Sequence, residues 1–185
     1  MKRRTLDLLA IGVGLSLTIG LLIAGSLLAW GANFTTTNVH NQLAEQQIYF
    51  PALGSTALDN PAISPYLNRY AGQQLLTGSQ AEAYADHFIA VHLGEIGGGK
   101  TYAQLSAQSM ADPTNAALKA QVQLLFQGST LRGLLLNAYA FSVFGELATW
   151  ASWTCFALAV VMAILSLLGA RHYAKTPPEA EFPAA

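Results

Sequence analysis

Charged residues and cysteine are scarce in this sequence of 185 residues. Charged residues make up 10% of the chain, against about 25% in a typical soluble domain, and the formal net charge is −1. A nucleic-acid-binding protein needs a basic face to neutralise phosphates, and a disordered chain needs many charges and few apolar residues, so the composition excludes both classes. The single cysteine, Cys155, excludes an intramolecular disulfide and a cysteine-only metal site.

Apolar residues form 52% of the chain and are concentrated in two runs near its ends. No residue is charged from 8 to 30 or from 147 to 170. Each run has the length of about 20 residues with which a helix crosses a hydrocarbon core of about 30 Å. We therefore predict an all-α membrane protein with two spanning helices, at 8–30 and 147–170, and a mainly helical region between them.

Basic residues predict the orientation of the two helices. Five of them lie outside the runs at the ends of the chain: Lys2, Arg3, Arg4, Arg171 and Lys175. Residues 31–146 contain four basic and seven acidic residues. Because basic residues favour the cytoplasmic side, we expect residues 1–7 and 171–185 in the cytoplasm and 31–146 outside it. Tryptophan, whose indole ring favours the membrane interface, lies at the predicted outer ends of both helices: Trp30, Trp150 and Trp153.

A cleaved signal peptide is the alternative interpretation of the first run. The basic start at residues 1–4 fits a signal peptide, but the uncharged run exceeds the usual 7–15 residues of its apolar core. Residues 31–146 lie on the same side of the membrane in either case.

Breaker and cap residues predict the local structure of residues 31–146. A polar stretch at 33–37 precedes a short amphipathic helix with Val39 and Leu43, and residues 50–78 form an irregular loop with packed aromatic residues. Four helix starts follow: a capping box at Ser79–Glu82 with a stop at residues 97–99, a second box at Thr101–Gln104 with an end near Met110, an N-cap at Asp112 before a helix ending near Gly128, and a cap at Ser129 or Thr130.

The last predicted helix, from Leu131 through the second span, is longer than a membrane requires. Glu146 is the only charged residue between 133 and 170, and a helix over residues 133–170 is about 57 Å long. Its projecting apolar face needs cover from the rest of the chain or from a neighbour: Leu134, Leu135, Ala138, Phe141 and Phe144.

Small residues recur every four positions in the first run, at Ser16, Gly20 and Ala24. Such a stripe lets another helix approach closely, so we predict a packing face whose partner is either the second span or a helix of another protein. The simpler alternative is the ordinary abundance of glycine and alanine in spanning helices.

Residues 94–101, GEIGGGKT, match the phosphate-binding P-loop pattern. The P-loop requires a strand before it, whereas a helix is predicted here, and no apolar strand ending in aspartate follows to hold Mg²⁺. A helix end followed by a new cap explains the same letters, so we expect no nucleotide site.

Three residues on one predicted helix, His87, His92 and Glu95, raise the alternative of a metal site. His92 and Glu95 are three apart and share a face, whereas His87 is about 140° round the helix from His92. Histidines with ordinary hydrogen bonds are the interpretation we favour. No serine lies in a G-x-S-x-G elbow and Cys155 lies in the second run, so we predict no catalytic residue and no cofactor.

Glu146, at the outer end of the second run, and Arg132, four turns earlier, are ionisable residues next to the membrane. Such groups suggest a contact with a partner or a place in a proton path. A carboxylate solvated at headgroup level is the favoured alternative.

Three segments carry a resemblance to a known family: residues 84–92, YADHFIAVH; residues 99–105, GKTYAQL; and residues 131–141, LRGLLLNAYAF. The chain resembles actinobacterial two-span membrane proteins of about this length, from the first span to Arg171. Members often carry the label "aromatic ring-opening dioxygenase LigA", but such chemistry needs a His/His/carboxylate iron site in a soluble fold. The architecture also resembles the small accessory subunits of actinobacterial respiratory supercomplexes, in which menaquinol–cytochrome bc complex and cytochrome oxidase associate.

These observations predict a non-catalytic accessory or assembly subunit whose partners are integral membrane proteins, with subunits of a respiratory complex as the specific version. The alternative is a membrane protein whose outer region binds a small molecule or metal, at His92 and Glu95. A membrane enzyme is the third hypothesis.

Overall fold

The computed structural model describes residues 3–177 of the chain. Its named elements are all helices, and no strand occurs among these residues, although an isolated antiparallel bridge joins Tyr49 and Gln74. The predicted all-α class is therefore confirmed. The chain forms two compact units: residues up to Phe34 with those from Gly145 onward, which we call the helix-pair unit, and Thr35–Phe144, which we call the central unit.

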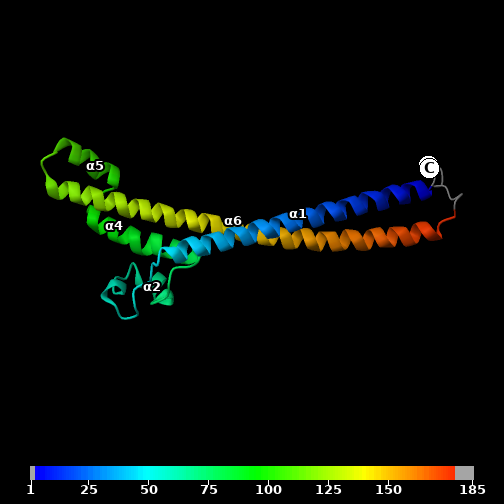
Figure 1. Ribbon diagram of the computed structural model, residues 1–185, viewed down its shortest axis with the longest axis horizontal. Coiled ribbons are helices and arrows are strands. Elements are labelled where there is room, and N and C mark those ends of the chain that lie inside the picture. The colour runs from blue at the N-terminus through cyan, green and yellow to red at the C-terminus, as the bar shows by residue number, and fades with distance from the viewer. Residues whose placement is uncertain (1–2, 178–185) are drawn as a thin grey trace. The chain divides into compact units, whose positions relative to one another are not determined.

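Two helices are long and apolar enough to cross a membrane, α1 (Arg3–Glu45) and α6 (Ala116–Lys175) (Figure 1). The two predicted spans are thus confirmed in length and composition. The predicted break between the first span and an amphipathic helix is wrong, since α1 continues through the polar stretch 33–37. No proline interrupts α1, and threonine and asparagine cost a helix interior only a fraction of 1 kcal/mol each.

The predicted helix end near Gly128 and restart at Ser129 or Thr130 are also wrong, because α6 continues without a break through these residues. Thr130 Oγ1 donates to the Phe126 carbonyl, 2.8 Å away and one turn back in the same helix. A Cβ at Gly128 would lie 2.5 Å from Leu93 Cδ2. A close tertiary contact explains this glycine, and a helix end does not.

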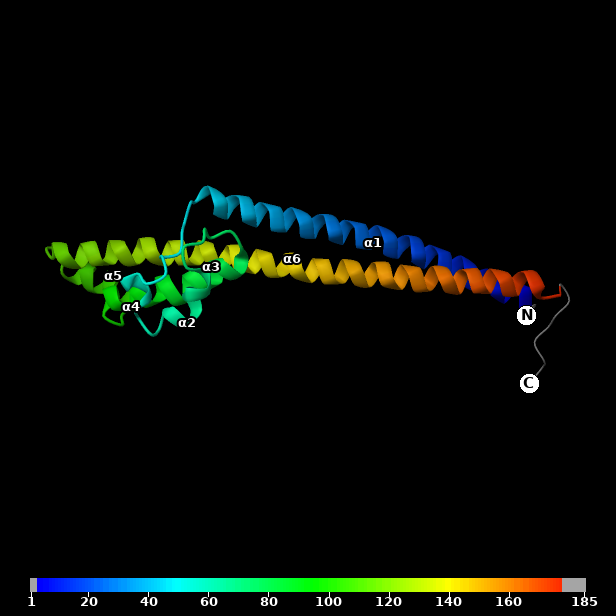
Figure 2. The same cartoon turned by 90° about the horizontal axis from the view of Figure 1, so that it is seen from below.

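In the helix-pair unit, α1 and the second half of α6 lie side by side (Figures 1 and 2). Glycine permits the close approach, since a Cβ at Gly25 would lie 3.0 Å from the Phe156 ring. A Cβ at Gly14 would overlap Ser166 Oγ. The buried Ser152 Oγ donates to the Gly25 carbonyl at 2.8 Å. Helices associate in lipid through close packing and interhelical hydrogen bonds, and this pair has both.

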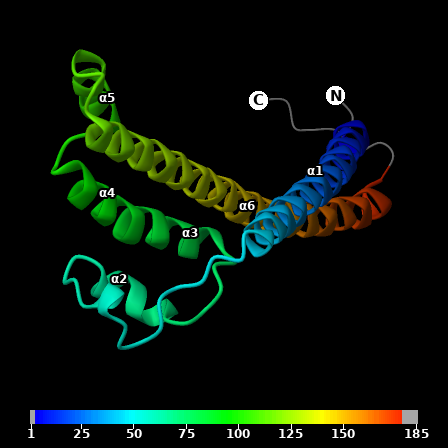
Figure 3. The same ribbon diagram turned by 60° about the vertical axis from the view of Figure 1, so that its left-hand side comes forward.

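The core of the central unit consists of side chains from α1, the following loop, α3 (Gly78–Tyr84), residues 85–89 and α6. Figure 3 shows the backbone of these elements. The loop contains three short helices, η1 (Thr56–Leu58), α2 (Ser64–Leu67) and η2 (Asn68–Tyr70), as the predicted irregular loop implies. Of its aromatic residues, Phe50 is buried against Tyr70 and Tyr84, whereas Tyr49 and Tyr66 are exposed. The buried members are Val39, Leu43, Phe50, Leu58, Ile63, Leu67, Leu75, Ala81, Ala85, Ile89 and Leu135.

Capping side chains determine where two helices of the central unit begin. α3 (Gly78–Tyr84) starts after Thr77, whose Oγ1 accepts from the Gln80 amide while Gln80 Oε1 accepts from the Thr77 amide at 3.1 Å. The capping box predicted at residues 79–82 is therefore displaced by two positions, because Gln80 provides the reciprocal bond. α5 (Tyr102–Ala111) begins with the predicted box of Thr101 and Gln104, which is confirmed.

The predicted N-cap of α6 is wrong, whereas the predicted end of α4 is confirmed. Asn115, and not Asp112, caps α6, because Asn115 Oδ1 accepts from the Leu118 amide at 3.0 Å. α4 (Ala90–Gly97) ends where expected, at Gly98, whose φ of +57° is the left-handed conformation that glycine adopts without strain.

A π-helical turn, η3 (Ala85–Ile89), joins α3 to α4. The Ala90 amide donates to the Ala85 carbonyl, five residues back. Such wide turns inside helices are often found at functional sites. This turn contains Asp86 and His87, whose contacts are described below with the candidate site.

Candidate functional site

Two of the three residues of the predicted stripe, Ser16 and Gly20, are exposed, whereas Ala24 is half-buried. Nothing lies within 4 Å of a Cβ built at Gly20. The pairing with α6 uses Gly14 and Gly25, which lie about 120–140° round the helix from Gly20. The second span therefore does not cover Gly20, and a helix of another protein stays the predicted partner at Ser16 and Gly20.

The projecting apolar face of α6 divides into a covered and an uncovered part within the central unit. Leu135 is buried in the core and Ala138 is half-buried against it. Leu134 and Phe141 are 63% and 53% exposed, and Phe144 is exposed to a similar degree. The chain thus covers one side of this face and leaves large apolar side chains on the other.

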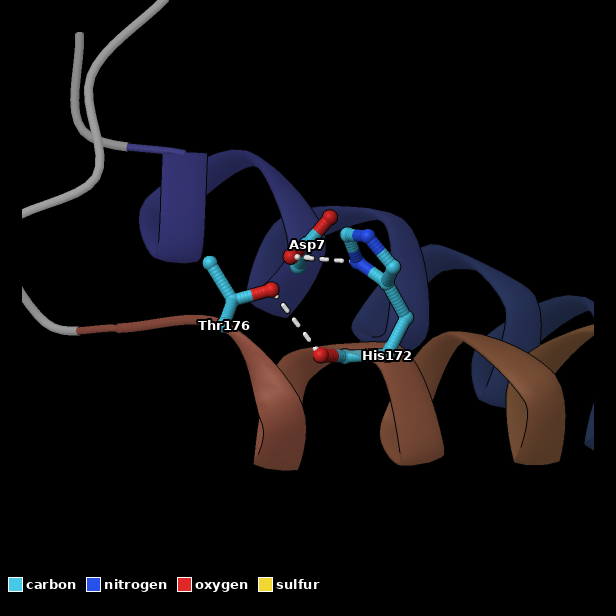
Figure 4. Close-up of polar contacts among 3 residues, drawn as sticks. All are labelled: Asp7, His172 and Thr176. Carbon is cyan, nitrogen blue, oxygen red and sulfur yellow. Dashed lines mark hydrogen bonds and ion pairs between the residues drawn. The ribbon is translucent and has the colours of Figure 1, made fainter.

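The ends of the helix-pair unit are joined by polar contacts that the sequence analysis missed (Figure 4). His172 Nδ1 lies 3.1 Å from Asp7 Oδ2, and Thr176 Oγ1 donates to the His172 carbonyl at 2.9 Å. The Arg4 guanidinium lies 4.4 Å from the centre of the Tyr173 ring. No local pattern could have revealed this cluster, because its two halves lie at opposite ends of the sequence.

The P-loop-like segment is a helix end and a new cap, as predicted. α4 precedes it, Gly98 and Gly99 both have positive φ, and Thr101 caps α5. Lys100 Nζ donates to Gln108 Oε1 at 3.1 Å. The segment therefore lacks the strand that aims amide groups at a phosphate.

The three residues of the alternative metal site contact different neighbours. The His87 ring stacks on Tyr66 with centroids 3.4 Å apart, and Glu95 Oε1 accepts from Asn60 Nδ2 at 3.2 Å. His92 Nδ1 lies 2.8 Å from the Phe88 carbonyl. No group of three His, Cys, Asp or Glu side chains suited to a metal occurs within residues 3–177.

The two predicted functional charges have different surroundings. Arg132 Nη2 donates to Asp86 Oδ1 at 2.6 Å, which ties the π-helical turn to α6. The Arg132 Nε atom is buried without a hydrogen-bond partner among the described residues. Glu146 is exposed, as the solvated alternative expects. Cys155 is half-buried in α6, in keeping with a packing role.

A pocket of about 360 Å³ lies in the central unit between η3, α4 and the first part of α6. Its lining is mostly apolar, with His92, Gln127 and Tyr84 as the polar residues. Burial raises the pKa of the Tyr84 phenol, because desolvation disfavours the phenolate. A mainly apolar pocket with few polar groups is the usual form of a small-molecule site. The sequence analysis singled out His92 but not Tyr84 or the residues of α6 that close the pocket.

Comparisons with protein-family models, with curated proteins and with solved structures find no match. Two surfaces of this chain are open to a partner, the side of α1 with Ser16 and Gly20 and the uncovered apolar residues of α6 at Leu134, Phe141 and Phe144.

Proposed function

We propose that this protein is a non-catalytic accessory or assembly subunit of a larger membrane complex. One observation carries the proposal: α1 pairs with α6 through the side bearing Gly14 and Gly25, and leaves open a second small-residue side at Ser16 and Gly20. Two such sides allow one helix to pack against two neighbours at once. The second neighbour we propose is a spanning helix of another integral membrane protein, which small residues let approach closely.

The exposed apolar residues of the central unit support a second contact with the same complex. Leu134 precedes the predicted span by more than three helical turns and Phe141 by fewer than two, so both lie outside the predicted span in the proposed orientation. Large apolar side chains left in water mark protein–protein contacts. A partner surface outside the membrane would cover them.

The proposed orientation places both ends of the chain in the cytoplasm and the central unit outside. It is tested with Asp59→Cys and Lys175→Cys, each in a Cys155→Ala background, because both native side chains are exposed. A membrane-impermeant maleimide is expected to label the Asp59→Cys protein in intact cells and the Lys175→Cys protein only after permeabilisation. The reverse pattern would contradict the positive-inside argument.

Gly20→Leu is expected to release the partner while the α1–α6 pairing persists. A leucine side chain fills the space in which the partner helix packs, and losing 1–2 kcal/mol of packing lowers recovery about tenfold. The measurement is affinity purification in mild detergent from the native membrane, with quantitative mass spectrometry. Ser26→Leu is the matched control, since Ser26 is exposed and lies about 120° round the helix from Gly20.

A respiratory supercomplex is the specific assembly that we propose, on the architectural resemblance stated above. Stoichiometric co-purification with oxidase subunits, and haem bands in a reduced-minus-oxidised optical spectrum, are the expected results. A colourless eluate that contains this protein alone would overturn the accessory function. Unchanged partner recovery with Gly20→Leu would overturn the packing face.

A further inference from the structure

We propose that the pocket of the central unit binds a small, mainly apolar molecule through a hydroxyl group that donates a hydrogen bond to His92. This function goes beyond membership of a membrane complex and uses a different surface. The pocket volume of about 360 Å³ is within the range of small-molecule sites.

The contact between His92 and its own helix determines which ring nitrogen is free. Nδ1 lies 2.8 Å from the Phe88 carbonyl oxygen, which can only accept. Nδ1 therefore carries the proton, and in the neutral ring Nε2 is an acceptor. His92 lines the pocket, and its Nε2 atom makes no hydrogen bond within residues 3–177. An acceptor on the wall of an apolar pocket selects a ligand that donates.

The apolar residues of the lining indicate what the part of the ligand beyond its hydroxyl group is made of. Phe88, Leu93 and Leu131 contribute apolar surface from two sides of the pocket, and burial of apolar ligand surface favours binding by roughly 25 cal/mol per Å². The neighbouring Phe88 ring lies 4.5 Å from the His92 ring, centroid to centroid, which restricts the imidazole to this orientation. A ligand with a compact hydrocarbon or aromatic body and one hydroxyl matches this surface.

A metal ion matches the pocket less well than a hydroxyl does. Glu95, the side chain best spaced to join His92 as a ligand, bonds to Asn60 instead. The other polar residues of the lining are an amide, Gln127, and a neutral phenol, Tyr84, whose pKa burial raises further. One imidazole without an anionic neighbour is a weak metal site, since protein zinc sites use three or four such ligands.

The test compares two probes of similar shape, 2-naphthol and 2-methoxynaphthalene, of which only the first can donate. The full-length protein in lipid nanodiscs is equilibrated with each probe by dialysis, and empty nanodiscs measure partition into lipid. We expect 2-naphthol to bind above the empty-disc level. His92→Phe, which keeps an aromatic ring but removes the acceptor, is expected to weaken 2-naphthol binding about three- to tenfold and to leave 2-methoxynaphthalene within twofold.

Leu131→Trp is the second variant, because a larger side chain at this lining position occupies the pocket, and it is expected to abolish binding of both probes. Nitrogen-15 NMR of the wild-type protein labelled at histidine is expected to show a protonated Nδ1 at His92. Equal effects of His92→Phe on the two probes, or no binding above the empty-disc level, would overturn the proposal. Gly20→Leu, which lies in the helix-pair unit and not among the residues that line the pocket, serves as the variant with unchanged probe binding.

Discussion

Gly78→Ala is expected to destabilise the central unit by about 2–3 kcal/mol, lowering its urea midpoint by about 1–2 M. A Cβ at position 78 would overlap both Oγ and Cβ of Ser142 and would lie 3.3 Å from the Tyr139 Cα atom. Backbone as well as side chain lies in the way, so rotation of Ser142 alone cannot relieve the collision. The first turn of α3 would have to move away from α6 and disturb the packing of Ala81 in the core.

The measurement is urea unfolding of the full-length protein, in which pulse proteolysis reports the unfolded fraction of the central unit at each urea concentration. Ser142→Gly provides a rescue, since it removes the nearest atoms that the new methyl group meets. Alone it costs about 1 kcal/mol, as glycine does in a helix interior. The double variant Gly78→Ala/Ser142→Gly is expected to be more stable than Gly78→Ala. A Gly78→Ala protein with the wild-type midpoint would show that α3 and α6 are not in this contact.

Gly25→Leu is expected to separate α1 from α6 in the helix-pair unit, at a cost of about 3 kcal/mol or more. The first side-chain atom would already lie 3.0–3.2 Å from three atoms of the Phe156 ring, and leucine adds three more carbons. The substitution also threatens the hydrogen bond from the buried Ser152 to the Gly25 carbonyl, because that bond requires close backbones. Interhelical bonds of this kind contribute about 0.6 kcal/mol in lipid.

Disulfide formation between Ile11→Cys and Gly169→Cys, in a Cys155→Ala background, measures the pairing. A Cβ at position 169 would lie 3.3 Å from Ile11 Cγ1, so the two new cysteines face each other. Addition of Gly25→Leu is expected to slow cross-linking about tenfold or more, since 1.4 kcal/mol is a factor of ten. Gly20→Leu is the control expected to cross-link at the wild-type rate. Equal rates in all three proteins would contradict the packing seen at Gly25.

The two glycine substitutions at positions 20 and 25 thus make opposite predictions. Gly25→Leu acts on contacts within the chain, and Gly20→Leu acts on the proposed partner. The sequence alone could not assign these roles, because both residues are glycines in one uncharged run. The spacing of four residues predicts a packing face at Gly20, whereas the contact with α6 is at Gly14 and Gly25. These two glycines are eleven positions apart and therefore lie on nearly the same side of the helix.

Helix starts show which local signals are reliable. Thr101 and Gln104 were correctly predicted as a capping box because both partners are close in sequence and no competing pair is near. At the start of α3, two overlapping choices existed, and Thr77 with Gln80 formed the box instead of Ser79 with Glu82. Gln80 also accepts from the Leu76 amide at 2.8 Å, a further bond that favours this choice.

Composition and neighbours along the chain are enough to predict two long apolar helices, the helix stop at Gly98 and the capping box at Thr101. These features follow from the cost of burying charge and from backbone bonds that span a few residues. Two other features appear only in the folded chain: Gly128 makes room for Leu93, and His92 and Leu131 share a pocket. Such contacts join residues tens of positions apart, where helix rotation and side-chain shape, and not local propensity, determine which atoms meet.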